Sequence, residues 1–159
     1  MIIDTPTLSD LAALMTESKP MFDQMGFEEY GNGWEYDKMM QWWIDVITNP
    51  VYDIVVAREA NRIVGVSVVM YQSKHFWHTG PVKACEMAHH AAPDLPKTTV
   101  CRVMIQMLAA MMDKIKTRGT KYFYIGYDPK PEFAAWGNYL MKKGFIDTSH
   151  VLMAKVGDL

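Results

Sequence analysis

Apolar residues at helical spacing mark two segments in the first third of the chain. After a short apolar opening at residues 1–4, which can form a strand, leucine and methionine recur three and four positions apart over residues 7–22. This spacing predicts a helix that Thr7 or Ser9 can cap. Residues 35–48 have the same spacing, and the Asn-Pro pair that follows predicts the end of a second helix.

The pattern then changes to that of extended segments. Residues 52–72 carry two β-branched runs separated by Glu59–Arg62, which predicts a strand, a tight turn and a second strand. A loop at 73–81 comes next, and residues 82–92 predict a further strand. The middle of the chain is therefore expected to form most of a sheet.

One helix is marked more clearly than the other elements. An unbroken apolar stripe with i, i+3 and i+4 spacing runs through Val100, Val103, Met104, Met107, Leu108, Met111, Met112 and Ile115. Gly119 predicts its stop. The rest of the chain predicts an aromatic strand at 121–128, a helix at 133–143 that ends at Gly144, and a closing strand at 150–156.

The bulk composition supports one folded domain. No internal repeat or low-complexity linker interrupts the order of elements, so we predict a single α+β domain over residues 1–159. A net charge of −2 without a dense basic run argues against nucleic-acid or anionic-membrane partners. Two cysteines outside any metal-ligand spacing favour a reduced, cytoplasmic setting. The fourteen methionines are expected either in the core or on a Met-lined binding surface.

The order of these elements, with three local motifs, resembles the GNAT acetyltransferases, which move an acetyl group from acetyl-CoA to an amine. The motifs are "VAREANRIVGVSVV" at 56–69, "HHAAPDLPKTTVCRVMIQML" at 89–108 and "NYLMKKGFIDTSHVLMAKV" at 138–156. The sequence "ESKP" at 17–20 is similar to a motif of small GNAT-like proteins of tailed bacteriophages. The resemblance implies the GNAT fold, a central, mostly antiparallel sheet flanked by helices.

The resemblance also implies an acetyl-CoA site, with departures from the family pattern. The phosphate loop, Arg/Gln-x-x-Gly-x-Gly/Ala, falls on residues 96–101, where proline replaces the basic or amide residue and Thr99 and Cys101 replace the glycines. The candidates for cofactor binding are His90, Ala91, Ala92, Lys97, Thr98, Thr99, Cys101 and Arg102. The alternative is that Thr98 only caps the helix and Lys97 is solvated.

Acetyl transfer needs a base that takes a proton from the acceptor amine. In the family a carboxylate on the fourth strand often does this, and Glu86 matches that position here. Strict alternation along the strand places Glu86 and His90 on one face, so both are catalytic candidates. The alternative is that Glu86 faces water or pairs with Lys83.

The family's acid, which protonates the thiolate of CoA, is often a tyrosine four residues before a Gly-Phe pair. Leu140 has that position here. Tyr139 is therefore a catalytic candidate only if the helix register differs by one residue, and Tyr124 and Tyr127 are alternatives.

The acceptor pocket of the family lies between the first two helices and a loop between strands. Here these segments carry aromatic residues that either recognise an apolar acceptor or pack in the core or an interface: Phe22, Phe27, Tyr30, Trp34, Trp42, Trp43, Phe76 and Trp77. The four histidines His75, His78, His89 and His90 match no recognised metal-ligand spacing, so we expect no metal.

Two hypotheses of function stay open. The first is a GNAT-type N-acetyltransferase that uses acetyl-CoA and an amine acceptor. The second is a non-catalytic GNAT-fold protein, phage-encoded and acting in the host cytoplasm, that binds a protein partner. A homodimer is a further expectation for either.

Overall fold

The computed structural model describes residues 1–24, 33–72, 83–126 and 134–146. The chain forms two compact units, residues 1–125 and 126–159. In the first unit a short 3₁₀ helix at Leu8–Asp10 accompanies the elements β1 (Ile2–Asp4), α1 (Leu11–Asp23), α2 (Tyr36–Thr48), β2 (Tyr52–Glu59), β3 (Arg62–Gln72), β4 (Lys83–Ala91), α3 (Lys97–Thr117) and β5 (Tyr122–Tyr124). The second unit contains α4 (Ala134–Lys142).

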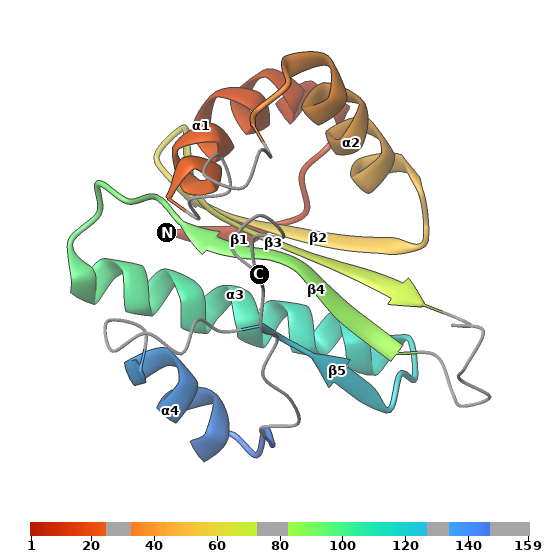
Figure 1. The fold of residues 1–159 in the computed structure, drawn as a ribbon, viewed down its shortest axis with the longest axis vertical. Helices are drawn as coiled ribbons and strands as arrows, with labels where there is room; N and C mark the ends of the chain where they lie inside the picture. The colour runs from red at the N-terminus through yellow and green to blue at the C-terminus, as the bar shows by residue number, and fades with distance from the viewer. Residues whose placement is uncertain (25–32, 73–82, 127–133, 147–159) are drawn as a thin grey trace, which may run out of the picture. The chain divides into compact units, whose positions relative to one another are not determined.

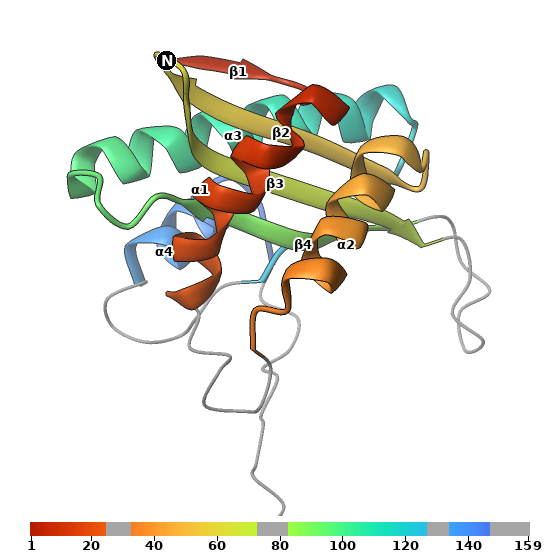
Figure 2. The ribbon, with the colours of Figure 1, turned by 90° about the horizontal axis from the view of Figure 1, so that it is seen from above.

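One five-stranded sheet organises the first unit. Its strands lie in the order β1-β2-β3-β4-β5, which Figure 2 shows for the first four. The strands β1 to β4 pair antiparallel, and β5 runs parallel to β4. This mixed α+β architecture confirms the predicted fold class and the predicted strands at 52–59, 62–72 and 82–92.

Helices cover both faces of the sheet (Figure 1). The helices α1 and α2 lie on one face, where Leu14 and Trp43 pack in one cluster with Val66 and Val68 of β3. On the opposite face lies α3, and its predicted apolar stripe contacts the sheet through Val103, Met107, Met111 and Ile115. Because α1 and α2 precede the hairpin and α3 follows it, the two faces are built by separate parts of the chain.

The hairpin between β2 and β3 has the two-residue turn that the sequence predicts. Ala60 and Asn61 connect Glu59 to Arg62, and Ala60 has a φ of 53°. A positive φ is uncommon for alanine, because its Cβ approaches the backbone. Thr7 rather than Ser9 precedes the 3₁₀ helix, and its N–H donates to the carboxylate of Asp10, the residue before α1, at 2.8 Å.

The helix α3 approaches β3 closely at Gly65. A Cβ at this position would lie 2.6 Å from Cγ1 of Val103 and 2.9 Å from Sδ of Met107. Gly65→Ala should therefore lower the free energy of unfolding by about 1–3 kcal/mol, since Val103 is stiff and buried. Urea denaturation measures this loss. Gly33→Ala, where nothing lies within 4 Å of the new Cβ, is the matched control, and equal losses in both variants would contradict the prediction.

The end of α3 is fixed to the beginning of β2 through Arg118. Its guanidinium donates to both carboxylate oxygens of Asp53 at 2.8 and 3.1 Å, and to the carbonyl oxygens of Pro50 and Tyr52 at 2.7 and 3.2 Å. Tyr71 completes the group, because its hydroxyl donates to Asp53 at 2.8 Å. The chain then turns at the predicted stop, Gly119, which has a φ of 67°.

In the second unit, α4 ends where the sequence predicts. Gly144 has a φ of 93°, and its N–H donates to the Met141 carbonyl at 3.0 Å. The N–H of Phe145 donates to the Leu140 carbonyl at 3.1 Å, which closes the helix in the way typical of a C-terminal glycine. The predicted strand at 150–156 and the loop at 73–81 lie outside the described residues. The single domain over 1–159 stays a prediction.

Candidate functional site

The strand β4 contains a bulge at Met87 that changes which side chains share a face. Along the register, Val68 of β3 pairs with Ala88 while Val69 pairs with Glu86, so Met87 has no counterpart on β3. Val68 belongs to the core under α1 and α2, and Val69 to the core under α3. Residues directly opposite in an antiparallel pair project to the same side. Ala88 therefore faces α1 and α2, and Glu86 faces the side of α3.

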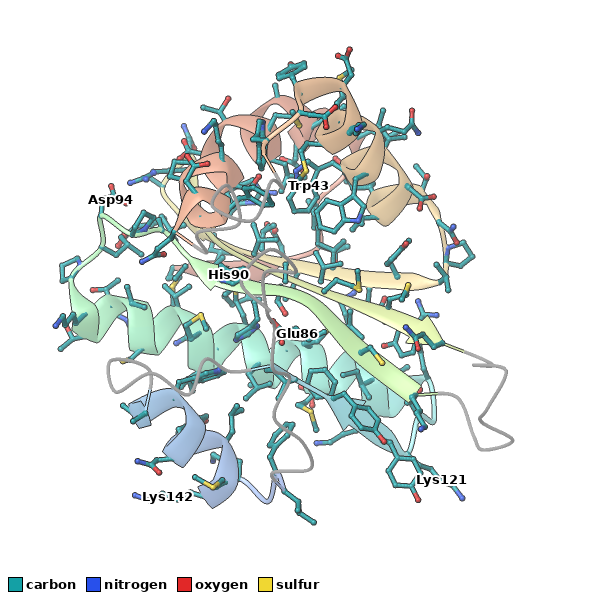
Figure 3. The ribbon with its side chains drawn as sticks, viewed as in Figure 1. Trp43, Glu86, His90, Asp94, Lys121 and Lys142 are labelled. Atoms are coloured by element: carbon teal, nitrogen blue, oxygen red, sulfur yellow. The ribbon has the colours of Figure 1, made fainter. Side chains whose placement is uncertain are left out.

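The prediction that Glu86 and His90 lie on one face is therefore wrong. His90 pairs with Val66, whose side chain belongs to the core under α1 and α2. An inserted residue in one strand breaks the two-residue period, so a step of four residues from Glu86 to His90 no longer returns to the same face. Figure 3 labels both side chains on β4.

A cavity of about 260 Å³ lies on the face of the sheet that α1 and α2 cover. Its lining residues are Ser18, Met21, Phe22, Trp34, Met39, Trp42, Trp43, Val66, Met87, Ala88 and His90. Four of the predicted acceptor-pocket aromatics are therefore brought together, while Phe27, Tyr30, Phe76 and Trp77 lie outside the described residues. The contribution of Ser18 could have been found in the sequence, since Met21 and Phe22 follow it by three and four positions on the helix.

The aromatic wall of the cavity is held by ring contacts. Phe22 and Trp34 meet edge to face with centroids 5.4 Å apart, and Trp42 and Trp43 lie 4.5 Å apart. Trp43 is 2% exposed, and its indole N–H has no hydrogen-bond partner among the described residues. The Ser18 hydroxyl donates to the Leu14 carbonyl within α1.

His90 is the titratable side chain among the described lining residues. Its burial lowers the pKa of the imidazole, because a charged ring loses hydration there. The ring is therefore neutral at pH 7 and has a lone pair that can accept a proton.

The adjacent histidine has a different role. His89 projects to the α3 side, where its Nε2 donates to the Met104 carbonyl at 3.1 Å and its Nδ1 accepts from the Ser67 hydroxyl at 2.9 Å. The carbonyl can only accept, so Nε2 carries the proton. Burial is the main cause that lowers the pKa of His89 to about 4. The histidine is thus a neutral structural link between the sheet and α3.

Among the described strands, β5 pairs with the outer edge of β4 over only part of its length. The parallel partner β5 meets it over Lys83–Cys85, and β4 continues to Ala91. On its other side β4 stays paired with β3 as far as Ala91, and the N–H of Ala92 donates to the Val64 carbonyl at 3.0 Å. The backbone of the candidate segment His90–Ala92 thus lies beyond the point where β5 ends.

The candidate phosphate loop leads directly into α3. Pro96 is the residue that precedes the first turn, and it has an extended conformation, so Thr98 is not the cap. The N–H of Thr99 donates to the Pro96 carbonyl at 2.8 Å. The side chains of Lys97, Thr98, Cys101 and Arg102 are exposed, and Lys97 and Arg102 have no ion-pair partner among the described residues. Cations and free backbone N–H groups at a helix start attract anions, so this segment has groups that can hold a phosphate.

An arginine that the sequence did not indicate holds the loop before α3. Arg62, at the start of β3, donates to both oxygens of Asp94 at 2.7 and 3.0 Å and to Glu17 of α1 at 3.0 Å. The pKa of Asp94 is lowered mainly by these bonds from Arg62. This arginine therefore balances the one carboxylate of the loop.

Tyr139, the third catalytic candidate, lies on α4 in the second unit. Its ring stacks on Trp136 with centroids 5.6 Å apart, and the ammonium of Lys143 lies 5.6 Å from its centroid. Its role as an acid stays a prediction. Of the alternatives, Tyr124 lies on β5 under the ammonium of Lys83 at 5.3 Å, and Tyr127 lies outside the described residues.

Metal-ligand clusters and membrane-spanning helices are both absent from the described part of the chain. No group of three or more His, Cys, Asp or Glu side chains there could hold a metal ion. None of the helices in that part is long and apolar enough to cross a membrane. His75 and His78 lie outside it.

The sequence matches no protein-family model and no curated protein. Solved structures do match. The aminoglycoside N-acetyltransferase AAC(6')-Iy in complex with CoA is 13% identical, with a TM-score of 0.72 over 97% of this chain and 93% of that chain. A predicted acetyltransferase with acetyl-CoA from Clostridium acetobutylicum is 12% identical, with a TM-score of 0.67 over 99% and 97%.

A third match is a transcriptional regulator from Bacillus halodurans, 15% identical, with a TM-score of 0.72 over 97% of this chain and 98% of that chain. Together with the sheet and its helices, these similarities show that the chain has the GNAT fold.

Proposed function

We propose that the protein is an N-acetyltransferase that uses acetyl-CoA as donor. The observation that carries this proposal is the position of His90 in a ligand-sized cavity, on a strand that β5 meets over Lys83–Cys85. In the reaction the amine nitrogen bonds to the acetyl carbon and the carbon–sulfur bond breaks. The amine gives up a proton, and the CoA thiolate takes one up.

The donor would be held by residues at the start of α3. Lys97 and Arg102 are exposed cations near the N-terminal end of a helix of 21 residues, where the backbone carries partial positive charge. Thr99 and Cys101 replace the family's small residues. The backbone N–H groups of Lys97 and Thr98 lie in the first turn of the helix, where such groups bind phosphate regardless of side chain. The backbone of His90, Ala91 and Ala92 would face the thioester.

His90 would accept the proton of the amine. It lines the cavity on the same face as Ala88, while Glu86 projects to the other side of the sheet. Its lowered pKa keeps the ring neutral at pH 7, as a general base requires. Glu86 would take part only through a chain of water molecules, and Tyr139 remains a proposed acid for the thiolate.

A second candidate function, a protein-binding module without catalysis, has one observation in its favour. Thr99 and Cys101 stand near the start of α3, where the family's glycines would let a phosphate approach the backbone more closely, and Pro96 stands in place of the family's basic or amide residue. A GNAT-like protein of phage origin with a protein partner would fit this loss. The transcriptional regulator among the similar structures shows that the fold is not reserved for proteins described as acetyltransferases.

Calorimetric titration with CoA separates the two functions. We expect micromolar binding, and a Kd about ten- to hundredfold weaker in the double variant Lys97→Ala/Arg102→Ala, because two charges near the phosphates are lost. Lys116→Ala/Lys121→Ala removes the same charge from an exposed position in the last turn of α3 and from another beyond the helix, and is the matched control. No binding of CoA by the wild-type protein, or equal losses in both double variants, would contradict the proposed donor site.

A further inference from the structure

We infer that the acceptor is a small, largely apolar monoamine with an aromatic or branched aliphatic body. This inference rests on the proposed function, because it names the substrate that the cavity beside His90 would take. Three features of the cavity carry it: the charge of its wall, its volume and the position of its titratable group.

The described wall of the cavity carries no charged side chain at pH 7. Of its eleven residues, Ser18, the buried indole of Trp43 and the neutral His90 are counted as polar. The other eight are aliphatic, aromatic or methionine side chains. The Ser18 hydroxyl is already bound to the Leu14 carbonyl. An acceptor with several ammonium groups would lose hydration here without a carboxylate to balance it, and that loss costs several kcal/mol for each charge.

A single ammonium group is compatible with this wall. Trp34, Trp42 and Trp43 line the cavity, and an indole ring attracts a cation placed over its face. This attraction is weak enough that the bound ammonium can still lose its proton. Burial in apolar surroundings also lowers the pKa of an amine, so that the neutral, nucleophilic form becomes accessible. The cavity therefore favours one amine that loses its proton after binding.

The volume limits the size of the acceptor. A cavity of about 150 Å³ holds one benzene ring. The cavity here, about 260 Å³, leaves roughly 110 Å³ beyond such a ring, or space for three or four more heavy atoms at about 30 Å³ each. A ring with a two-carbon amino chain fills this space, whereas an amine built of several sugar rings exceeds it.

The position of His90 gives the acceptor an orientation. His90 and Ala88 line the cavity from β4. Met39 lines it from α2, and Trp34 lines it from the residues just before α2. The amine would lie toward β4, where His90 can take its proton, and the apolar body would lie against the helices. This preference differs from that of the structurally similar aminoglycoside N-acetyltransferase, whose named substrates are polyamino sugars.

The test compares two amines on the full chain. Titrations with 2-phenylethylamine and with neamine, followed by calorimetry and by ligand-observed NMR, are made with and without CoA. We expect 2-phenylethylamine to bind at least tenfold more tightly than neamine. Tighter binding of neamine would overturn the inference.

Two variants of the cavity wall and one control variant locate the bound amine. Ala88→Leu fills the cavity and should weaken 2-phenylethylamine at least tenfold, while Ala109→Leu makes the same change at an exposed position of α3 and should leave it unchanged. Met39→Glu places a carboxylate in the wall and should shift the preference toward neamine. Equal binding of 2-phenylethylamine by all three variants would overturn the inference even if one of them folded poorly, because the others still report.

The CoA titration keeps this inference separate from the proposed function. Amine binding without CoA binding would support the cavity's preference and reject the donor. CoA binding without binding of 2-phenylethylamine would overturn the inference alone. In either case the fold-change in Ala88→Leu should appear for the amine and be absent for CoA, because the start of α3 lies on the other side of the sheet (Figure 1).

Discussion

Replacing His90 by glutamine should lower the rate of acetyl transfer about 10²- to 10⁴-fold, the usual contribution of a general base. Glutamine keeps a polar side chain of similar length but cannot take up a proton near neutral pH. The wild-type rate should fall with decreasing pH as the imidazole becomes protonated, at a pH below the ordinary value for histidine, since burial lowers its pKa. The glutamine variant should lose this dependence.

Ser18→Ala is the matched control for that experiment. It changes another polar group of the same cavity wall, whose hydroxyl is bound within α1, and should alter the rate by less than about threefold. CoA titration should give the same Kd for wild type and both variants. A His90→Gln enzyme with the wild-type rate and pH profile would remove His90 from the proposed mechanism.

The second large effect is a loss of stability in acid that comes from His89. Its pKa is about 4 in the folded protein, against 6.5 for an ordinary histidine. Between these values the unfolded chain takes up a proton that the folded chain does not, so stability falls as the pH falls through this window. A difference of about 2.5 pH units corresponds to about 3 kcal/mol, complete near pH 4 and absent above pH 6.5.

Urea denaturation at a series of pH values from 7 to 4 measures this effect. His89→Gln can keep a donor toward Met104 and an acceptor toward Ser67, so it should flatten the pH dependence rather than only lower the stability. His90→Gln is the comparison, because burial lowers the pKa of His90 too. The part of the acid sensitivity that comes from His90 can then be separated from the part that comes from His89. An unchanged slope in His89→Gln would show that the acid sensitivity lies elsewhere.

The elements of the fold could be predicted because their signals are local. The stripe through α3 needs only the spacing of apolar residues along one helix, and the stop at Gly119 needs only a residue that tolerates positive φ. Likewise the aromatic wall could be expected, because Phe22, Trp34, Trp42 and Trp43 come from the two helices that precede the sheet.

The geometry of the site could not be predicted, because it depends on a bulge. Methionine at position 87 has no property that indicates an unpaired position in a strand, so alternation placed Glu86 with His90. The start of α3 was also uncertain, since Thr98 has a side chain that often caps helices, whereas the structure begins the helix after Pro96.

The ion pairs of Arg62 could not be predicted from the sequence either. Its partners Glu17 and Asp94 lie 45 and 32 residues away, and nothing in the sequence pairs them. Contacts of this kind depend on the arrangement of the sheet, which local periodicity leaves open. The aromatic residues of the cavity and the loop before α3 were therefore both predicted from the family resemblance, and neither from its contacts.

Arg62 and Arg118, which bind the segments at the two ends of α3, have a consequence for local unfolding. Arg62 ties the loop before the helix to the start of β3, and Arg118 ties its last turn to the start of β2. The helix is thereby fastened at both ends to the same hairpin, and the three elements should exchange their amide hydrogens as one cooperative unit. By contrast α1 contains Pro20, which cannot donate a backbone hydrogen bond to the preceding turn. The last turn of α1, beyond the Glu17 that Arg62 also binds, should therefore open and exchange its amide hydrogens more readily than α3.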